Sequence, residues 1–424
     1  MRALRWLGWA ALCLALLAAL ALGWAWPRAQ VVHATPTPTS PAEIQRGAYL
    51  ARVGNCMGCH TARGGLPWAG GRGIATPFGT LYSGNLTPDA DTGLGLWSTA
   101  DFWRALHQGR SRDGRLLYPA FPYTHYTRVT RADADALFAY LQGLVPVRQA
   151  SRTHALRFPY DSQLALAFWQ ALFFRPETFT PEPGQSVQWN RGAYLVQGLA
   201  HCGACHTPRN DWGGLREAQA LAGGQVAGQG WYAPALDAAH EAGLQRWAGE
   251  DALALLKKGV APQAGVSGPM AEVVFGSLQY LDDADLRAML HYLQSLPERA
   301  LAHAPGAPPT AAVLEQGRGL YAEHCAQCHG AQGEGRAGAY AALAGNRAVL
   351  LAEPMNLVQM VLHGGYAPAT AGNPRPHGMP PFVQRLSNEE IAAVLSYMRS
   401  AWGNDAGRVD AMDVHRVRER GSPR

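Results

Sequence analysis

Three short segments with the pattern Cys-x-x-Cys-His constrain this chain more than any other feature. They are CMGCH at 56–60, CGACH at 202–206 and CAQCH at 325–329, and they contain six of the seven cysteines. Disulfide bonds or a zinc ion shared by two pairs would account for the cysteines, but not for the histidine after every second one. In this pattern two thiols one helical turn apart attach to the vinyl groups of a haem, and the histidine binds its iron. The sequence therefore predicts three covalently bound haem c groups.

The motifs assign both the attachment residues and the proximal ligands. The expected attachment residues are Cys56, Cys59, Cys202, Cys205, Cys325 and Cys328, and the expected proximal iron ligands are His60, His206 and His329.

The segments around the motifs also repeat. A similar stretch precedes each motif, and in it a glycine is followed two residues later by a tyrosine: Gly47 and Tyr49, Gly192 and Tyr194, Gly319 and Tyr321. An amphipathic helical pattern ends each segment, at 131–144, 282–296 and 387–402, with acidic residues in the first turn, where the helix dipole favours them. Helices before and after the haem, with Gly/Pro-rich loops between them, are typical of cytochrome c. The sequence predicts a mainly α fold with three tandem cytochrome c domains.

Proline-rich linkers separate these domains. We expect an N-terminal signal peptide or anchor at 1–30, a Pro/Thr linker at 31–41, cytochrome c domains at 42–175, 186–300 and 310–405, and a solvated basic tail at 406–424.

The N-terminus carries an export signal. Arg2 and Arg5 precede an uncharged run at 6–27, which is longer than a usual signal-peptide core and is flanked by tryptophans at both ends. At ~1.5 Å per residue this run matches the thickness of a bilayer core. We favour an uncleaved anchor over cleavage after Ala25 or Ala29. In both cases the arginines stay inside, so we expect the rest of the chain on the periplasmic side of the inner membrane.

Several function classes are excluded by what the sequence lacks. The formal charge is only +5, from 36 basic and 31 acidic residues, and the arginines are scattered rather than clustered, so we expect no nucleic-acid partner. The Gly-rich segments lie beside the haem motifs, without the strand–helix context of a phosphate-binding loop. Neither a nucleophile elbow nor a metalloprotease motif is present. We expect an electron carrier and not an enzyme.

The chain resembles the triheme cytochrome c subunit of bacterial membrane-bound dehydrogenases. The resemblance rests on SGNLTPDADTGLGLWSTADFWRAL (83–106), GPMAEVVFGSLQYLDDADLRAM (268–289) and GMPPFVQRLSNEEIAAVLSYMR (378–399). Members of this family serve alcohol, gluconate and sorbitol dehydrogenases, and related cytochromes accompany molybdenum-containing aldehyde or N-heterocycle oxidoreductases. The resemblance implies a catalytic dehydrogenase subunit as partner, from which electrons pass to ubiquinone or another respiratory acceptor.

Methionines supply two expected distal ligands. Met379 precedes a proline in the loop before the last helix of the third domain, where it is not part of the apolar face of a helix. Met270 lies before the last helix of the second domain and matches the family motif. A thioether is a common second axial ligand of an electron-transfer haem.

The first domain lacks such a methionine. Phe121 stands opposite Met379 when the loops are aligned, and the family usually has methionine there. His125, four residues further on, is the favoured replacement; His107 is a weaker one, and an open or water-bound iron remains an alternative. An open haem would permit a peroxidase-like multihaem enzyme, and the motifs would also suit a cytochrome subunit of a haem–copper oxidase.

Overall fold

The computed structural model describes residues 40–226, 228–299 and 307–420, together with Trp6, Trp9 and Cys13. Apart from these three residues, the expected N-terminal anchor and most of the Pro/Thr linker therefore lie outside the described residues. Within the described part of the chain, no helix is long and apolar enough to cross a bilayer.

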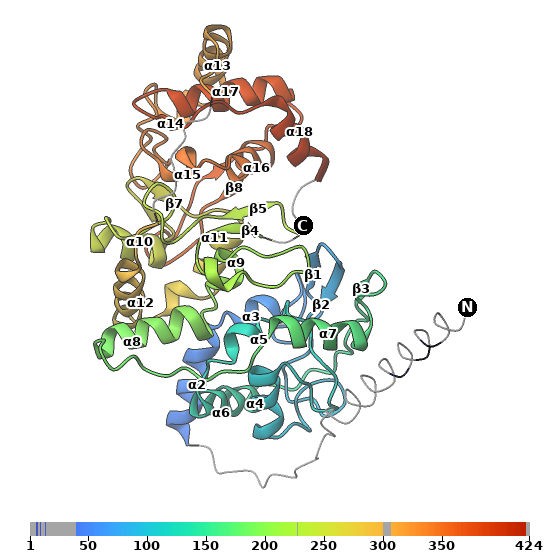
Figure 1. The fold of residues 1–424 in the computed structure, drawn as a ribbon. Coiled ribbons are helices and arrows are strands. Elements are labelled where there is room, and N and C mark those ends of the chain that lie inside the picture. The colour runs from blue at the N-terminus through green and yellow to red at the C-terminus, as the bar shows by residue number, and fades with distance from the viewer. Residues whose placement is uncertain are drawn as a thin grey trace.

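Three similar units follow one another along the chain, and each pairs its first helix with its last (Figure 1). These helices are α2 (Pro41–Val53) with α6 (Arg131–Gln142), α8 (Val187–Tyr194) with α12 (Asp283–Ser295), and α13 (Ala311–His324) with α17 (Asn388–Ser400). Five of the six begin at a serine or threonine whose side chain accepts a hydrogen bond from a backbone N–H of the first turn. The predicted mainly α fold with three tandem units is confirmed, and we call these units repeats 1, 2 and 3.

The other elements lie between these paired helices, except α18 (Ala411–Arg420), which follows the last of them. The helices are α3 (Cys56–Cys59), α4 (Thr99–Gln108), α5 (Tyr123–Tyr126), α7 (Gln163–Phe173), the π-helix Leu195–Leu199, α9 (Gly203–His206), the 3-10 turn Glu217–Gln219, α10 (Gly249–Lys258), α11 (Gly268–Gly276), the 3-10 turn Leu278–Tyr280, α14 (Ala326–His329), α15 (Arg347–Leu350), α16 (Met355–His363) and α18 (Ala411–Arg420). The strands are β1 (Gly73–Thr76), β2 (Gly79–Tyr82) and β3 (Ala155–Leu156) in one sheet, and the hairpins β4 (Gly224–Val226) with β5 (Trp231–Ala233), β6 (Val260–Ala261) with β7 (Ala264–Gly265), and β8 (Gly365–Tyr366) with β9 (Gly378–Met379). All pairings are antiparallel.

A glycine lets the first and last helices of each repeat approach closely. A Cβ atom at Gly47 would lie 1.9 Å from the Ala136 carbonyl oxygen, and one at Gly192 would lie 1.9 Å from that of Ala288. In repeat 3 the equivalent residue is Gly317, at 2.2 Å from the Ala393 oxygen. The three crossings therefore require glycine for space.

This geometry corrects the alignment of repeat 3. The Gly-x-Tyr pattern predicts Gly319 as the equivalent of Gly47, but a Cβ at Gly319 would meet nothing within 4 Å. The distance along the chain from the crossing glycine to the first motif cysteine varies, from 47 to 56, 192 to 202 and 317 to 325. In repeat 2 the longer spacing includes the π-helix Leu195–Leu199, which accommodates an added residue within a helix.

The hydrophobic core is divided unequally among the repeats. Repeats 1 and 2 share one cluster, which runs from Leu50 in α2 to Leu293 in α12, whereas repeat 3 has its own cluster around Leu362 and Leu395. The two clusters meet through polar contacts: Asn356 donates to the Tyr232 carbonyl at 2.7 Å and accepts from the Tyr232 N–H at 2.8 Å. Repeats 1 and 2 are therefore one packing unit, and repeat 3 is attached to it.

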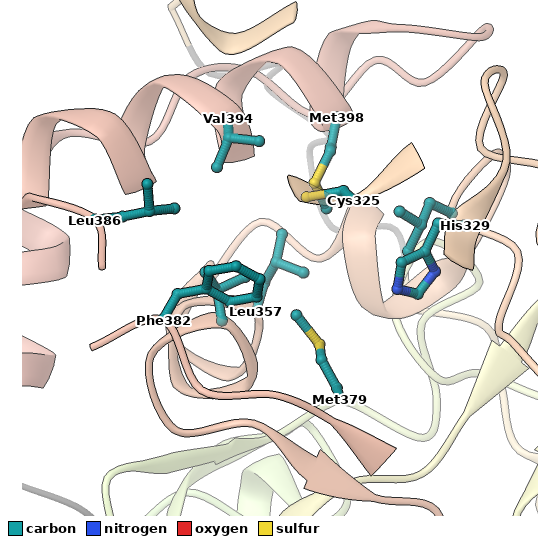
Figure 2. Close-up of a pocket in the computed structure, with 10 residues that line it drawn as sticks. Cys325, His329, Leu357, Met379, Phe382, Leu386, Val394 and Met398 are labelled. Atoms are coloured by element: carbon teal, nitrogen blue, oxygen red, sulfur yellow. The ribbon is translucent and has the colours of Figure 1, made fainter. Parts of the chain in front are cut away.

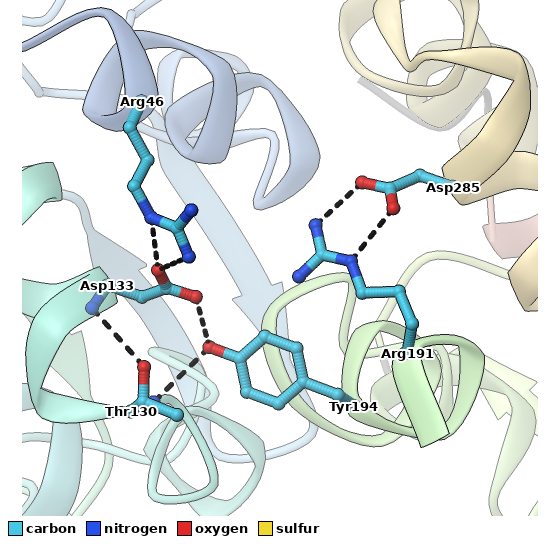
Figure 3. A network of polar contacts seen from close by, with 6 residues as sticks. All are labelled: Arg46, Thr130, Asp133, Arg191, Tyr194 and Asp285. Carbon is cyan, nitrogen blue, oxygen red and sulfur yellow. Dashed lines mark hydrogen bonds and ion pairs between the residues drawn. The ribbon is translucent and has the colours of Figure 1, made fainter. Parts of the chain in front are cut away.

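A tyrosine from each of repeats 1 and 2 binds an aspartate of the other repeat, and Figure 3 shows the one from repeat 2, Tyr194. Within repeat 1, Arg46 binds the carboxylate of Asp133 with its Nε at 2.7 Å, and Tyr194 from repeat 2 donates its hydroxyl to the same carboxylate at 2.6 Å. The equivalent pair in repeat 2 is Arg191 with Asp285, at 2.8 and 2.7 Å.

The exchange is reciprocal. Tyr49 from repeat 1 donates its hydroxyl to Asp285 at 2.7 Å, so each repeat supplies the tyrosine that completes the other's arginine–aspartate pair. Burial of Tyr49 and the nearby Asp285 carboxylate raise the pKa of this phenol, which stays a hydrogen-bond donor throughout the neutral range.

The C-terminal segment differs from the prediction of a solvated tail. Residues 411–420 form α18, which packs against α16 and α17 with Val414 and Val417 buried. The guanidinium of Arg418 donates to the carbonyl oxygens of Val383 and Leu386, and to the Asn388 side chain. The prediction is wrong for these residues because Val414 and Val417, three positions apart, give the basic helix an apolar side.

The unequal cores predict which fragments fold. A chain ending at residue 305 retains the whole shared cluster, and we expect it to fold and to bind haem at two motifs. A chain ending at residue 146 keeps only half of that cluster and loses Tyr194, so we expect it to be unfolded or aggregated. Thermal unfolding and haem staining of both fragments test this, and equal behaviour of the two would contradict the shared core.

Candidate haem-attachment sites

Each Cys-x-x-Cys-His motif forms one tight helical turn. The histidine N–H donates to the carbonyl of the first cysteine at 2.9 Å in the first motif and at 3.0 Å in the other two, which places both thiols on the same side of the turn. The six thiols are free cysteines in the structure. Burial raises the pKa of Cys56 and of Cys202 to about 12 and that of Cys325 to about 11, so these thiols are protonated in neutral water.

The three histidines share one hydrogen-bond arrangement. Nδ1 lies 2.7 Å from the Gly84 oxygen in His60, 2.7 Å from the Pro234 oxygen in His206 and 2.9 Å from the Ala341 oxygen in His329. A carbonyl can only accept, so Nδ1 carries the proton and Nε2 keeps its lone pair. This tautomer is the one that binds a metal through Nε2, with the carbonyl fixing the ring.

Burial supports the same protonation state. It lowers the pKa of His60 and His206, although the backbone hydrogen bonds partly oppose this, so both rings are neutral at neutral pH.

Two arginines that the sequence analysis missed hold the first two motifs. Arg72 donates to the Gly58 carbonyl at 2.6 Å, and Arg209 donates to the Ala204 carbonyl at 3.0 Å. Both carbonyls belong to the residue before the second motif cysteine. Arg72 also forms an ion pair with Glu272 of α11 at 2.6 Å, so the first motif is tied to repeat 2. The two arginines lie at different distances after their motifs, which removes any common spacing from the sequence.

In repeat 3 the predicted ligands come together in one apolar cavity (Figure 2). Cys325, His329 and Met379 line it, and the remaining lining residues are Leu343, Leu357, Val361, Phe382, Leu386, Val394 and Met398. Met379 is held by β9, where it pairs with Gly365 of β8. An attachment cysteine, an imidazole and a thioether around an apolar space fit a haem, and Met379 stays our predicted distal ligand.

Met270 lies in the first turn of α11 and is packed against the shared core of repeats 1 and 2. Its helix begins at Gly268, whose positive φ of 53° brings the backbone against the Trp231 ring. Its coordination of the second haem stays a prediction.

His125 lies at the boundary between repeats 1 and 2. It is buried in α5, and both ring nitrogens lack a hydrogen-bond partner. A Cβ atom at Gly203, inside the second motif, would lie 2.9 Å from its Cε1 and 3.6 Å from its Nε2. The structure thus brings this ring to the attachment segment of repeat 2, and its coordination of the first haem stays a prediction. Burial, followed by His201 and nearby arginines, lowers the pKa of His125 to about 3.

Tyr126, the next residue in the chain after His125, contacts the segment just before the first motif. Tyr126 donates its hydroxyl to the Gly54 carbonyl at 3.4 Å, and the centroid of its ring lies 5.3 Å from that of the Phe121 ring.

His107, the weaker candidate, lies in the last turn of α4. Its Nδ1 donates to the Thr127 carbonyl at 2.9 Å, and its ring is stacked on Trp103. With Nδ1 protonated, its Nε2 has the tautomer that a metal ligand needs.

These sites define a c-type cytochrome: paired cysteines for covalent attachment, and an imidazole held for iron. The haem, when bound, supplies one-electron Fe(III)/Fe(II) chemistry. The sequence model of the cytochrome c family matches residues 44–144, 190–297 and 314–402, so the chain belongs to the cytochrome c family.

Curated relatives place the chain within this family more closely. It is 39% identical over 406 residues to an alcohol dehydrogenase (quinone) cytochrome c subunit from Gluconacetobacter polyoxogenes, covering 92% of this chain and 86% of the relative. It is 36% identical over 400 residues to a gluconate 2-dehydrogenase cytochrome c subunit from Pantoea cypripedii, covering 89% and 90%. One of the subunits of nicotinate dehydrogenase from Pseudomonas putida is 42% identical over 397 residues, which cover 91% of this chain but only 32% of that protein. The predicted resemblance is confirmed, and the chain is of the electron-transfer type rather than the catalytic type.

Loss of one attachment site should remove one haem and leave the others. We expect Cys325→Ser with Cys328→Ser to lower the mass of the mature protein by one haem and to keep the shared core of repeats 1 and 2 folded, because repeat 3 has a separate core. Intact mass and pyridine haemochrome absorbance give the count. Loss of all haem from this variant would show that the repeats do not mature independently.

Proposed function

We propose that this chain is a triheme cytochrome c attached to the periplasmic face of the inner membrane. It accepts electrons from a partner dehydrogenase subunit and passes them to ubiquinone or another respiratory acceptor. The observation that carries this proposal is the same imidazole arrangement at three motifs, with Nδ1 held by a backbone carbonyl and Nε2 left for iron. Three such sites on one chain suit a relay of single electrons.

The attachment motifs of repeats 1 and 2 are close enough for such a relay. Burial raises the pKa of Cys205, and the Cys59 thiol across the repeat boundary lies near enough to raise it further. A Cβ atom at Gly54, beside the first motif, would lie 3.2 Å from the Leu199 side chain, next to the second. Haems 1 and 2 therefore form the coupled pair of the proposed relay.

A polar path joins repeat 3 to this pair. Asn356 of α16 bonds Tyr232, and two residues later the Pro234 carbonyl holds the ring of His206. On the other side, Leu357 follows Asn356 and lines the cavity with Met379. The proposed link between haems 2 and 3 crosses this contact.

The proposal also concerns which kind of dehydrogenase is the partner. Relatives of this chain are named for alcohol and gluconate dehydrogenases, and one belongs to nicotinate dehydrogenase. We infer that a separate catalytic subunit oxidises a small alcohol, sugar acid or N-heterocycle and delivers its electrons here.

Purification of the native complex tests this function. The complex should contain a second, catalytic subunit, and addition of its substrate should reduce the haems, as seen in their absorbance. Addition of a soluble ubiquinone analogue should then reoxidise them. A cytochrome that purifies alone and is reduced by none of these substrates in membranes would contradict the proposal.

The same preparation separates the alternatives. Turnover of hydrogen peroxide by the purified chain would indicate the peroxidase-like enzyme, and co-purification with a copper-containing oxidase would indicate the oxidase subunit.

A further inference from the structure

The helix α7 has its polar side facing the protein and its apolar side facing outward. Its sequence, QLALAFWQALF, contains no charged residue. Leu164, Phe168 and Leu172 recur at four-residue intervals on one face and are 57%, 52% and 73% exposed, whereas Leu166 is buried. A helix on a water-soluble surface shows the opposite arrangement.

The polar side chains of α7 all bond inward. Gln163 accepts from the Leu116 N–H at 2.8 Å and donates to its carbonyl at 3.2 Å, and Gln170 donates to the Gln108 carbonyl at 2.9 Å. The indole N–H of Trp169 donates to the Trp212 carbonyl at 2.8 Å. The outward face therefore consists of the apolar side chains of Leu164, Phe168 and Leu172.

Neither the haem sites nor the cytochrome c repeats account for this helix. It lies at 163–173, between the family matches that end at 144 and begin again at 190. It packs beside α4 and the loop before α5, away from the paired terminal helices (Figure 1). An exposed apolar face of this kind marks a surface that is covered in the working protein.

We propose that α7 lies on the lipid bilayer, with Leu164, Phe168 and Leu172 in the boundary between headgroups and acyl chains. This rests on the membrane attachment in the proposed function. At about 16 Å, α7 is too short to span a bilayer and suits an orientation in its plane. A protein partner would meet a polar rim around the apolar centre, and α7 offers no polar side-chain group outward.

Two features of the chain outside α7 agree with a lipid surface. Residues 28–39 connect the apolar run at 6–27 to the start of the described chain and can span at most about 40 Å. A membrane that holds the run therefore lies within about that distance of Ser40. Exposed Arg157 and Arg175 precede and follow the helix, with Asp161 as the single acidic residue between them. Basic residues beside an apolar face favour anionic headgroups.

A spin label on α7 tests the proposal in the full chain. The label is placed at exposed Ala171 by Ala171→Cys in a Cys13→Ser background, with haem attached, on vesicles of phosphatidylethanolamine and phosphatidylglycerol. The control is Val187→Cys, a position 89% exposed at the start of α8. We expect the ratio of oxygen to nickel-chelate collisions at position 171 to exceed that at 187 by about threefold or more.

A second variant removes the apolar face and keeps the helix. Leu164→Gln, Phe168→Gln and Leu172→Gln retain helix propensity, and we expect them to bring the ratio at position 171 down to the control value. If the labelled chain that retains Leu164, Phe168 and Leu172 binds vesicles while its label at position 171 stays accessible to the nickel chelate, the proposed role of α7 is overturned. N-terminal attachment would then still stand. Failure to bind vesicles would overturn both. Protection of position 171 from both reagents by a co-purified subunit would show a protein interface instead.

Discussion

Gly317→Ala is expected to destabilise repeat 3, whereas Gly319→Ala, two residues further along the same helix, is expected to stabilise it. A methyl group at Gly317 would meet the Ala393 carbonyl oxygen at 2.2 Å, so α13 and α17 must separate. Overpacking of this kind costs about 1–3 kcal/mol or more. Gly319 is exposed with open space around it, and alanine there should gain about 1 kcal/mol of helix propensity.

The two variants differ by one methyl group at neighbouring positions, so each controls for the other. Denaturant unfolding of repeat 3, followed through its haem absorbance, gives the difference in the free energy of unfolding. Equal stabilities would mean that the helices of repeat 3 do not cross at Gly317. Gly47→Ala and Gly192→Ala should destabilise the shared unit in the same way.

Met379→Leu is expected to change the third haem far more than Met398→Leu. Both methionines line the cavity that contains His329, but Met379 lies in the short strand β9 and Met398 lies on α17 within the core. If Met379 is the distal ligand, its removal leaves a high-spin iron with a potential lower by on the order of 0.1 V, since axial ligands set haem potentials over about 0.8 V.

The Met398→Leu change conserves volume and should cost less than about 1.5 kcal/mol, with the haem still low-spin. Redox titration with electron paramagnetic resonance of both variants distinguishes the ligands. A high-spin signal in Met398→Leu and a normal spectrum in Met379→Leu would assign the thioether to α17.

The sequence predicts the ends of the last helices well, because their caps and apolar stripes are local. The patterns at 131–144, 282–296 and 387–402 correspond to α6, α12 and α17 within two residues at each end. The attachment cysteines and proximal histidines are equally local, since one helical turn contains them. These features depend only on neighbours in the chain.

Features that depend on contacts between segments far apart in the sequence could not be predicted in this way. His125 follows Phe121 closely in sequence, yet its ring lies against Gly203 of repeat 2 because α5 packs on that repeat. The helix α7 has its few polar side chains turned inward, so the usual alternation of apolar core and polar surface gives no guide to its orientation. The crossing glycine of repeat 3 is displaced from the Gly-x-Tyr pattern and is identified only by the carbonyl that it meets.

The reciprocal tyrosines have a consequence for how strongly repeats 1 and 2 must attract each other. Tyr49 and Tyr194 occupy equivalent positions, so the pair resembles a two-fold dimer whose subunits are joined by residues 144–186. A short covalent connection gives such partners an effective concentration on the order of millimolar. Association worth little more than about 4 kcal/mol then keeps the pair closed. Separate chains of the two halves at micromolar concentration would lack this help and would need association worth about 8 kcal/mol to stay paired.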